Sequence, residues 1–150
     1  MKKILMFILM MISITSTCFA FEEPNSERWK KIGEDGKLAM WIDKQTLIIN
    51  TEQSQQSEHC GHTYVTTWFI QHENSKQGHD LIKVEADLNC RTLDFRYAAR
   101  YGEDGAVIES AEAPSRKPFS VLPGTVGEVM ILAIEELKKS KESIWDNFNR

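Results

Sequence analysis

The hydrophobic pattern of this chain changes once, from alternation at every second residue to the helical period, and this change restricts the possible folds. The segments 64–71, 81–88 and 93–100 alternate in side-chain character, whereas apolar residues after position 125 recur at helical spacing. Alternation is typical of β-strands, and a spacing of about 3.6 residues is typical of an amphipathic helix. The sequence therefore predicts several strands followed by one helix, which is the α+β class.

Alternation within the strand segments also predicts which side chains are buried. The segment 81–88 directs Ile82, Val84, Ala86 and Leu88 to one side, and Lys83, Glu85 and Asp87 to the other. Continuing this alternation places Cys90 on the buried side. The next segment directs Leu93, Phe95, Tyr97 and Ala99 inward, and Asp94, Arg96 and Arg100 outward. The segment 64–71 has aromatic and β-branched residues on both sides, which predicts a strand buried on both faces.

The tetrapeptide Gly-Glu-Asp-Gly occurs twice, at 33–36 and at 102–105. Glycine adopts positive φ without steric cost and aspartate tolerates tight turns, so both copies predict hairpin tips. The first hairpin would pair 28–32 with 37–43, and the second would pair 93–101 with 106–110. The polar segment 50–58 and the proline-containing segment 112–118 are predicted to be loops.

A helix start is encoded near the end of the chain. Pro123 and Gly124 end the extended segment, Thr125 is a good N-cap, and Glu128 three residues later completes a capping box. We therefore expect a helix that begins at Val126. Its apolar stripe, expected to lie on the sheet, consists of Val126, Val129, Met130, Ala133, Ile134 and Leu137, broadened by Ile131 and Leu132.

The N-terminal segment predicts the location of the protein. Two lysines precede an apolar run at 4–14 that is too short to span a bilayer, and the small residue Ala20 ends the segment. This pattern is typical of a secretory signal peptide over 1–20 with cleavage before Phe21. Cys18 lacks the preceding leucine of a lipid-attachment signal and is assigned to the discarded peptide. We expect an exported protein that is periplasmic, secreted or associated with the cell surface.

Charge and hydropathy restrict the partners of the mature chain, residues 21–150, which is long enough for one domain. The full chain has 18 basic and 22 acidic side chains; without Lys2 and Lys3 there are 16 basic ones, so the mature net charge is −6. Such a surface repels polyanions, and nucleic acid is not an expected partner. No second long apolar segment follows, so no transmembrane segment is expected in the mature chain. A protein partner is expected, and the oligomeric state stays open.

The mature chain holds the cysteines Cys60 and Cys90. An even pair in an oxidising compartment predicts one disulfide between them, which would stabilise the fold by about 3.5 kcal/mol by closing a loop of about 30 residues. The alternative is a metal site, because His59, Cys60 and His62 lie close together in the string EHCGH. That spacing matches no common closed zinc site, and no metal ligands are assigned.

Three segments together resemble the surface adhesin protein E-like domain family. They are WKKIGEDGKLAMWID from position 29, KVEADLNCRTLDFRY from position 83 and VLPGTVGE from position 121. The resemblance implies a single antiparallel β-sheet of about six strands with a C-terminal α-helix packed on one face. It covers a core of about 29–137 within the domain 21–150 and leaves 138–150 as a C-terminal extension. Cys90 matches a family cysteine that usually pairs with one late in the helix; this chain has Ile134 and Glu135 there, which favours Cys60 as the partner.

The resemblance also implies a binding function. The founding member of the family is an adhesin that binds host matrix and plasma proteins and can bind haem, through residues outside the shared motifs. We therefore expect a small, exported, non-enzymatic binding module of the bacterial envelope that binds host matrix or envelope proteins. The alternative is a periplasmic haem- or metal-binding protein that uses His59 or His62. No hydrolase, zinc-protease or catalytic-cysteine motif occurs, so no catalytic or cofactor-binding residues are predicted. His72 and His79, which flank a polar stretch, are interpreted as exposed loop histidines.

The C-terminal extension holds a candidate partner contact. Ile144, Trp145 and Phe148 would lie on one face if the helix continued through them. The expected apolar surface would be approached past Lys138, Lys139 and Lys141. The alternatives are a frayed chain end and an apolar patch that folds back onto the domain.

Overall fold

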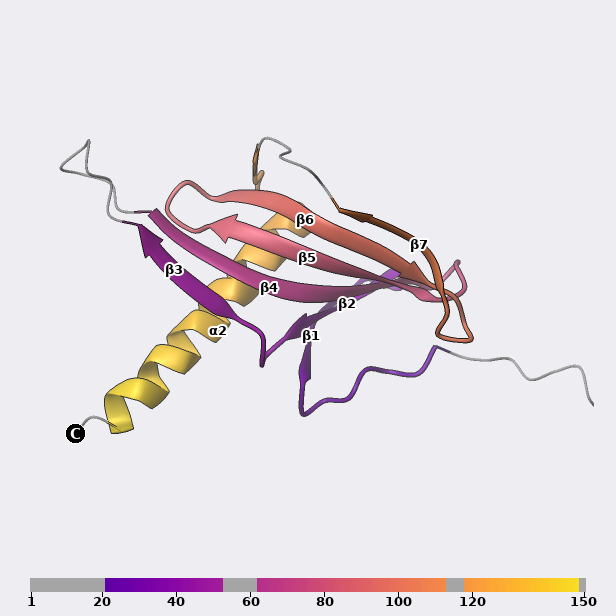
Figure 1. The fold of residues 1–150 in the computed structure, drawn as a ribbon, viewed down its shortest axis with the longest axis horizontal. Coiled ribbons are helices and arrows are strands. Elements are labelled where there is room, and N and C mark those ends of the chain that lie inside the picture. The colour runs from indigo at the N-terminus through magenta and orange to yellow at the C-terminus, as the bar shows by residue number, and fades with distance from the viewer. Residues whose placement is uncertain (1–20, 53–61, 113–117, 149–150) are drawn as a thin grey trace, which may run out of the picture.

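The computed structural model describes residues 21–52, 62–112 and 118–148, and it shows an open β-sheet with one α-helix across one face (Figure 1). The elements are β1 (Trp29–Glu34), β2 (Leu38–Asp43), β3 (Ile48–Glu52), β4 (His62–Glu73), β5 (His79–Asp87), β6 (Thr92–Tyr101), β7 (Val107–Glu112), β8 (Phe119–Ser120) and α2 (Val126–Phe148). The strands follow the order β1-β2-β4-β5-β6-β7, β3 also pairs with β4, and β8 pairs with β6. All these pairings are antiparallel. The predicted α+β architecture is confirmed.

Both copies of the repeated tetrapeptide form hairpin tips with the same chemistry. Asp35 and Asp104 each accept a hydrogen bond at Oδ1 from the backbone N–H two residues further on, at 3.0 Å in both cases. The glycines that follow them, Gly36 and Gly105, have φ values of 79° and 75°. A side chain at either position would be strained, which explains why glycine closes both turns.

The main core lies between α2 and one face of the sheet. Its fully buried side chains include Ile42, Phe69, Val84 and Leu93 from the strands, and Ile131 and Ile134 from the helix. Burial of each such side chain stabilises the fold by roughly 1.5–3 kcal/mol. A smaller cluster of Ala39, Trp41 and Ile70 lies on the opposite face, where Phe21, Trp29 and Leu81 pack against it. The segment before β1 therefore covers part of the face that α2 leaves open.

The helix begins at Val126, as predicted, but its N-terminal hydrogen bonds differ from a standard capping box. The carboxylate of Glu128 accepts a hydrogen bond from the backbone N–H of Gly124 at 2.7 Å, one residue before the expected cap. The hydroxyl of Thr125 donates to the carbonyl of Leu122 at 2.7 Å. The two side chains therefore fasten the segment before the helix to its first turn.

The apolar stripe of α2 is rotated about the helix axis relative to the prediction. Ile131 is completely buried, whereas Val126, Val129 and Leu132 are exposed by 46%, 38% and 51%. The prediction that Val126 and Val129 lie in the core is therefore wrong. The buried side of the helix is centred on Met130, Ile131 and Ile134, because those side chains meet the sheet. The orientation of the helix about its axis therefore leaves several of the predicted core side chains exposed on the surface.

Because of a β-bulge in β6, the observed alternation of its side chains differs from the predicted one. Lys83 pairs with Tyr97 and Val84 pairs with Phe95, so that Arg96 is the additional residue. Such an insertion reverses the side-chain alternation beyond it, so Tyr97 lies on the other face from Phe95. Tyr97 therefore does not share the face of Phe95 as predicted, and Asp94, predicted to face outward, is buried. Ala99 is buried as predicted, but beside Leu81 on the face opposite α2.

Three further local predictions are corrected by the structure. Residues 50–52 belong to β3 although the segment 50–58 was expected to be a loop. The strand β7 continues to Glu112, although the segment 112–118 was expected to be a loop. Cys90 lies in the turn between β5 and β6 and is exposed, because the strand alternation ends at Asp87. All three errors fall at strand ends, where the alternating pattern carries the least information.

Candidate functional site

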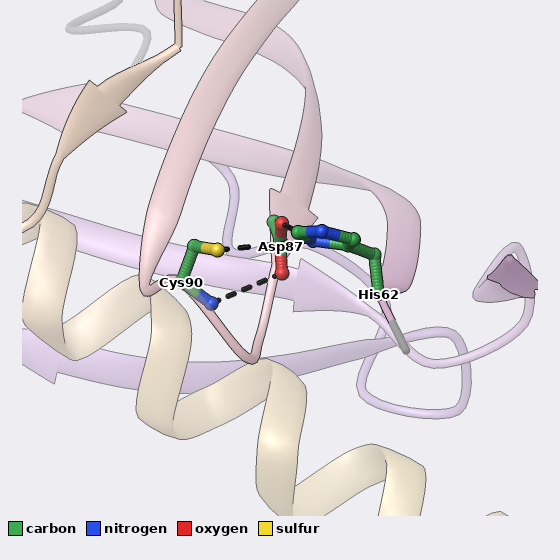
Figure 2. A group of neighbouring side chains, drawn as sticks. All are labelled: His62, Asp87 and Cys90. Atoms are coloured by element: carbon green, nitrogen blue, oxygen red, sulfur yellow. Dashed lines mark hydrogen bonds and ion pairs between the residues drawn. The ribbon is translucent and has the colours of Figure 1, made fainter. Parts of the chain in front are cut away.

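Three side chains of different chemistry converge where β4 begins and the β5–β6 turn starts (Figure 2). His62 is the first residue of β4, Asp87 is the last residue of β5, and Cys90 lies in the turn. The Nδ1 atom of His62 lies 2.7 Å from Oδ2 of Asp87 and 3.7 Å from Sγ of Cys90. All three donor atoms lie within 4.8 Å of one another. We call this group the His–Asp–Cys cluster.

Backbone hydrogen bonds hold Asp87 in its orientation. Its Oδ1 atom accepts hydrogen bonds from the backbone N–H groups of Asn89 at 3.0 Å and Cys90 at 3.1 Å. The side-chain oxygen of Asn89 in turn accepts from the backbone N–H of Thr63 at 2.9 Å, which docks the turn onto β4. Oδ2 of Asp87 is thereby left facing His62. Backbone N–H groups of the β5–β6 turn and of β4 therefore both hold the cluster in position.

The pKa of Asp87 lies below its ordinary value of 3.8. Burial of the side chain, which is only 8% exposed, is the largest influence and raises the pKa. The hydrogen bonds from Cys90, His62 and Asn89 together outweigh burial and lower it. Asp87 is therefore an ionised carboxylate at neutral pH, although its side chain is almost completely buried.

The cluster does not have the connectivity of a Cys–His–Asp catalytic relay. In such a relay the carboxylate binds one imidazole nitrogen and the nucleophile faces the other. Here Asp87 and Cys90 both approach Nδ1 of His62, so the nitrogen that would accept the thiol proton is the one bonded to the carboxylate. The three groups are arranged as convergent ligands around a common point.

The sequence pattern indicates only part of this cluster. His62 was a candidate metal ligand, but its neighbours His59 and Cys60 lie outside the described residues, and so does the Cys60–Cys90 disulfide, which stays a prediction. Asp87 was assigned to a polar strand face and Cys90 to the core. No sequence signal marks the cluster, because the antiparallel pairing of β4 with β5 brings together residues that are 25 and 28 positions apart.

A groove opens at the N-terminal end of α2, between the helix and the sheet. It is lined by Ile82, Phe95, Phe119, Leu122, Val126 and Met130, and we call it the α2 groove. Its volume is about 330 Å³. Phe119, Leu122 and Val126 at its rim are exposed by 41%, 65% and 46%. The groove was missed from the sequence because Val126 was assigned to the core.

The two histidines that flank the β4–β5 turn belong to a stack of rings. Phe21 stacks on His72 with 4.1 Å between ring centroids, and His79 stacks on Tyr101 at 5.0 Å. Nδ1 of His72 also lies 2.7 Å from the carbonyl oxygen of Gly78. Both histidines are partly buried, so their interpretation as exposed loop histidines is wrong. The reason is the segment before β1, which lays Phe21 against them.

The structure describes only part of the predicted partner contact in the C-terminal extension. α2 continues through Phe148, as a shared face for Ile144, Trp145 and Phe148 requires. Ile144 is 54% exposed, whereas the side chains of the other two residues lie outside the described ones. The helix extends beyond the sheet in this region (Figure 1). The predicted signal peptide, residues 1–20, also lies outside the described residues.

The fold and site define an α+β domain with an apolar groove on one helix and a separate His–Asp–Cys cluster. Comparison with protein-family models, with curated proteins and with solved structures finds no match for this chain. In the described part of the chain, no helix combines the length and hydrophobicity needed to cross a membrane.

Proposed function

We propose that this chain is an exported, non-enzymatic binding module of the bacterial envelope, and that it holds a protein partner at the α2 groove. One observation supports this function above the others: the large apolar side chains of Phe119, Leu122 and Val126 are exposed around a single groove. Contiguous exposed apolar surface is typical of a protein interaction site.

The size of the groove supports an apolar side chain as its occupant. At about 330 Å³ it lies near the lower end of the range for ligand pockets, so one or two side chains of a partner would occupy it. Burial of the part of each rim residue that is still exposed would contribute roughly 1 kcal/mol, and buried apolar anchors of this kind supply most of the affinity of an interface. The partner is therefore expected to present an apolar segment.

The proposed location and partner class rest on the sequence. A signal peptide over 1–20 would deliver the module outside the cytoplasm. The resemblance to the surface adhesin protein E-like domain family supports host matrix proteins or envelope proteins as the partner class. An acidic mature chain, with a net charge of −6 once Lys2 and Lys3 are removed, makes nucleic acid an unfavourable partner.

The test uses tagged protein of residues 21–150 as bait for the envelope fraction and for purified host matrix proteins. Leu122→Asp places a charge in the rim, and Ile108→Asp is the matched control, because these leucine and isoleucine side chains are exposed by 65% and 66%. Both variants should keep the wild-type melting temperature. We expect the wild type and Ile108→Asp to retain the partner and Leu122→Asp to lose it. Equal capture by all three proteins would contradict the proposal.

A further inference from the structure

We propose that His62, Asp87 and Cys90 form a binding site for a thiophilic divalent metal ion of the zinc class. This inference goes beyond the binding-module function, because none of these three residues lines the α2 groove. It rests on the convergence of a nitrogen, an oxygen and a sulfur donor on one point, which Figure 2 shows.

One of the separations between donor atoms matches that of a tetrahedral zinc site, and a second is too short by a small margin. Zinc bonds of about 2.0 Å to nitrogen and oxygen and about 2.3 Å to sulfur separate two ligands by about 3.3 Å for nitrogen and oxygen and about 3.6 Å for nitrogen and sulfur. The separation of Nδ1 of His62 from Sγ of Cys90 is 3.7 Å, which already fits. The separation of Nδ1 from Oδ2 of Asp87 is 2.7 Å, so a small side-chain rotation would open the hydrogen bond for the ion.

The outer contacts of the cluster orient its ligands before a metal arrives. The two backbone N–H groups on Oδ1 of Asp87 fix the carboxylate and leave Oδ2 for the ion. The ring of His62 stacks near-parallel to Tyr64, with 5.8 Å between centroids, which restrains the imidazole plane. Such outer-shell contacts typically change metal affinity by about 10–100-fold. Asp87 is buried and Cys90 is exposed, so the ion would enter from the sulfur side.

The donor set selects the class of metal. A thiolate and an imidazole favour zinc and similar borderline ions, whereas Mg²⁺ and Ca²⁺ prefer oxygen ligands alone. The carboxylate and the thiolate together supply two negative charges, which balance a divalent cation. Three protein ligands leave the fourth tetrahedral position for water or for a further ligand.

The proposed site uses the thiolate form of Cys90, so the predicted disulfide to Cys60 and metal binding are alternative states. A dithiol reductant would convert that disulfide into two thiols, and would itself close to a disulfide as it delivers two electrons and two protons. Binding is therefore measured on the reduced protein.

The experiment titrates reduced, metal-free protein of residues 21–150 with Co²⁺ as a spectroscopic substitute for Zn²⁺. We expect saturable binding with a thiolate-to-cobalt charge-transfer band that Zn²⁺ abolishes and Mg²⁺ does not. Cys90→Ser should remove the band. His62→Gln and Asp87→Asn should weaken binding by about tenfold or more. Asp87→Asn retains an acceptor for the turn amides, and circular dichroism checks that each variant folds.

The control variants are Cys60→Ser and His72→Gln, which should bind Co²⁺ as the wild type does. Absence of saturable Co²⁺ binding by the reduced wild type would overturn the proposal. A band that persists in Cys90→Ser but is lost in Cys60→Ser would also overturn it, because the metal would then be held by the other cysteine.

Discussion

The guanidinium of Arg28 and the carboxylate of Asp43 meet beside the first hairpin, with 2.7 Å between Nη2 and Oδ2. The Asp43 side chain is fully buried, whereas that of Arg28 is 48% exposed. Oδ1 of Asp43 also accepts a hydrogen bond from the backbone N–H of Gln45 at 2.8 Å. Burial is the largest influence on the pKa of Asp43 and raises it, but the hydrogen bonds from Arg28, Gln45 and Thr46 prevail and hold the pKa below 3.8.

We expect Arg28→Ala to lower the free energy of unfolding by about 2 kcal/mol at neutral pH, because it leaves a buried carboxylate without its cation. The depressed pKa of Asp43 means that its stabilising contribution is present above pH 3.8 and is lost as the pH falls further towards the folded-state value. Denaturant unfolding at neutral and acidic pH measures both effects, with Lys37→Ala on the same hairpin as the control. A variant as stable as the wild type at neutral pH would contradict the expectation.

Gly78 closes the β4–β5 turn with a φ of 85°, and a Cβ atom there would lie 1.9 Å from the carbonyl oxygen of Tyr101. We expect Gly78→Ala to destabilise the fold by more than about 2 kcal/mol, because strain and a backbone clash add together. Gly36→Ala is the matched control: its φ is 79°, but nothing lies within 4 Å of the added atom. Thermal unfolding should therefore separate the two variants. Equal losses would show that the backbone angle alone matters.

His79 should make the stability of the domain sensitive to mild acid. Burial is the main cause that holds the pKa of His79 below 6.5; Asp80 opposes this shift and His72 adds to it. The unfolded state then binds more protons, so the contribution of His79 is present above pH 6.5 and is lost as the pH falls below that value. We expect His79→Gln to flatten the decline in melting temperature between about pH 7 and about pH 5. If the melting temperature of His79→Gln declines as steeply as that of the wild type, titratable groups other than His79 cause the decline.

The C-terminal extension should contribute little to stability. Ile144 is 54% exposed, and the last described side-chain contact from α2 to the sheet region is the hydrogen bond from Nζ of Lys141 to the carbonyl of Leu47 at 3.2 Å. Truncation after Lys141 keeps that contact and should leave the melting temperature nearly unchanged. If Ile144, Trp145 and Phe148 form a partner contact, the truncated protein will lose a captured partner. A large fall in melting temperature would instead indicate that these residues pack on the domain.

Local sequence patterns were sufficient for the helix start, the hairpin tips and the fold class, but not for β3. The helix start at Val126 followed from Pro123, Gly124 and the capping residues, because each acts within one turn of the chain. The repeated hairpin tips followed from glycine and aspartate for the same reason. The α+β class followed from the single change of hydrophobic period. Each of these features depends on residues close together in the sequence.

Only the tertiary structure decided which surfaces are functional candidates. The His–Asp–Cys cluster depends on the register of β4 against β5, the α2 groove depends on the rotation of α2 about its axis, and the ring stack depends on where Phe21 lies. The bulge at Arg96 changed the faces of β6 without any sign in the alternating pattern. Periodicity records which side of an element is apolar, but the contacts between distant segments are set by packing and strand register, and these appear only when the whole chain is folded.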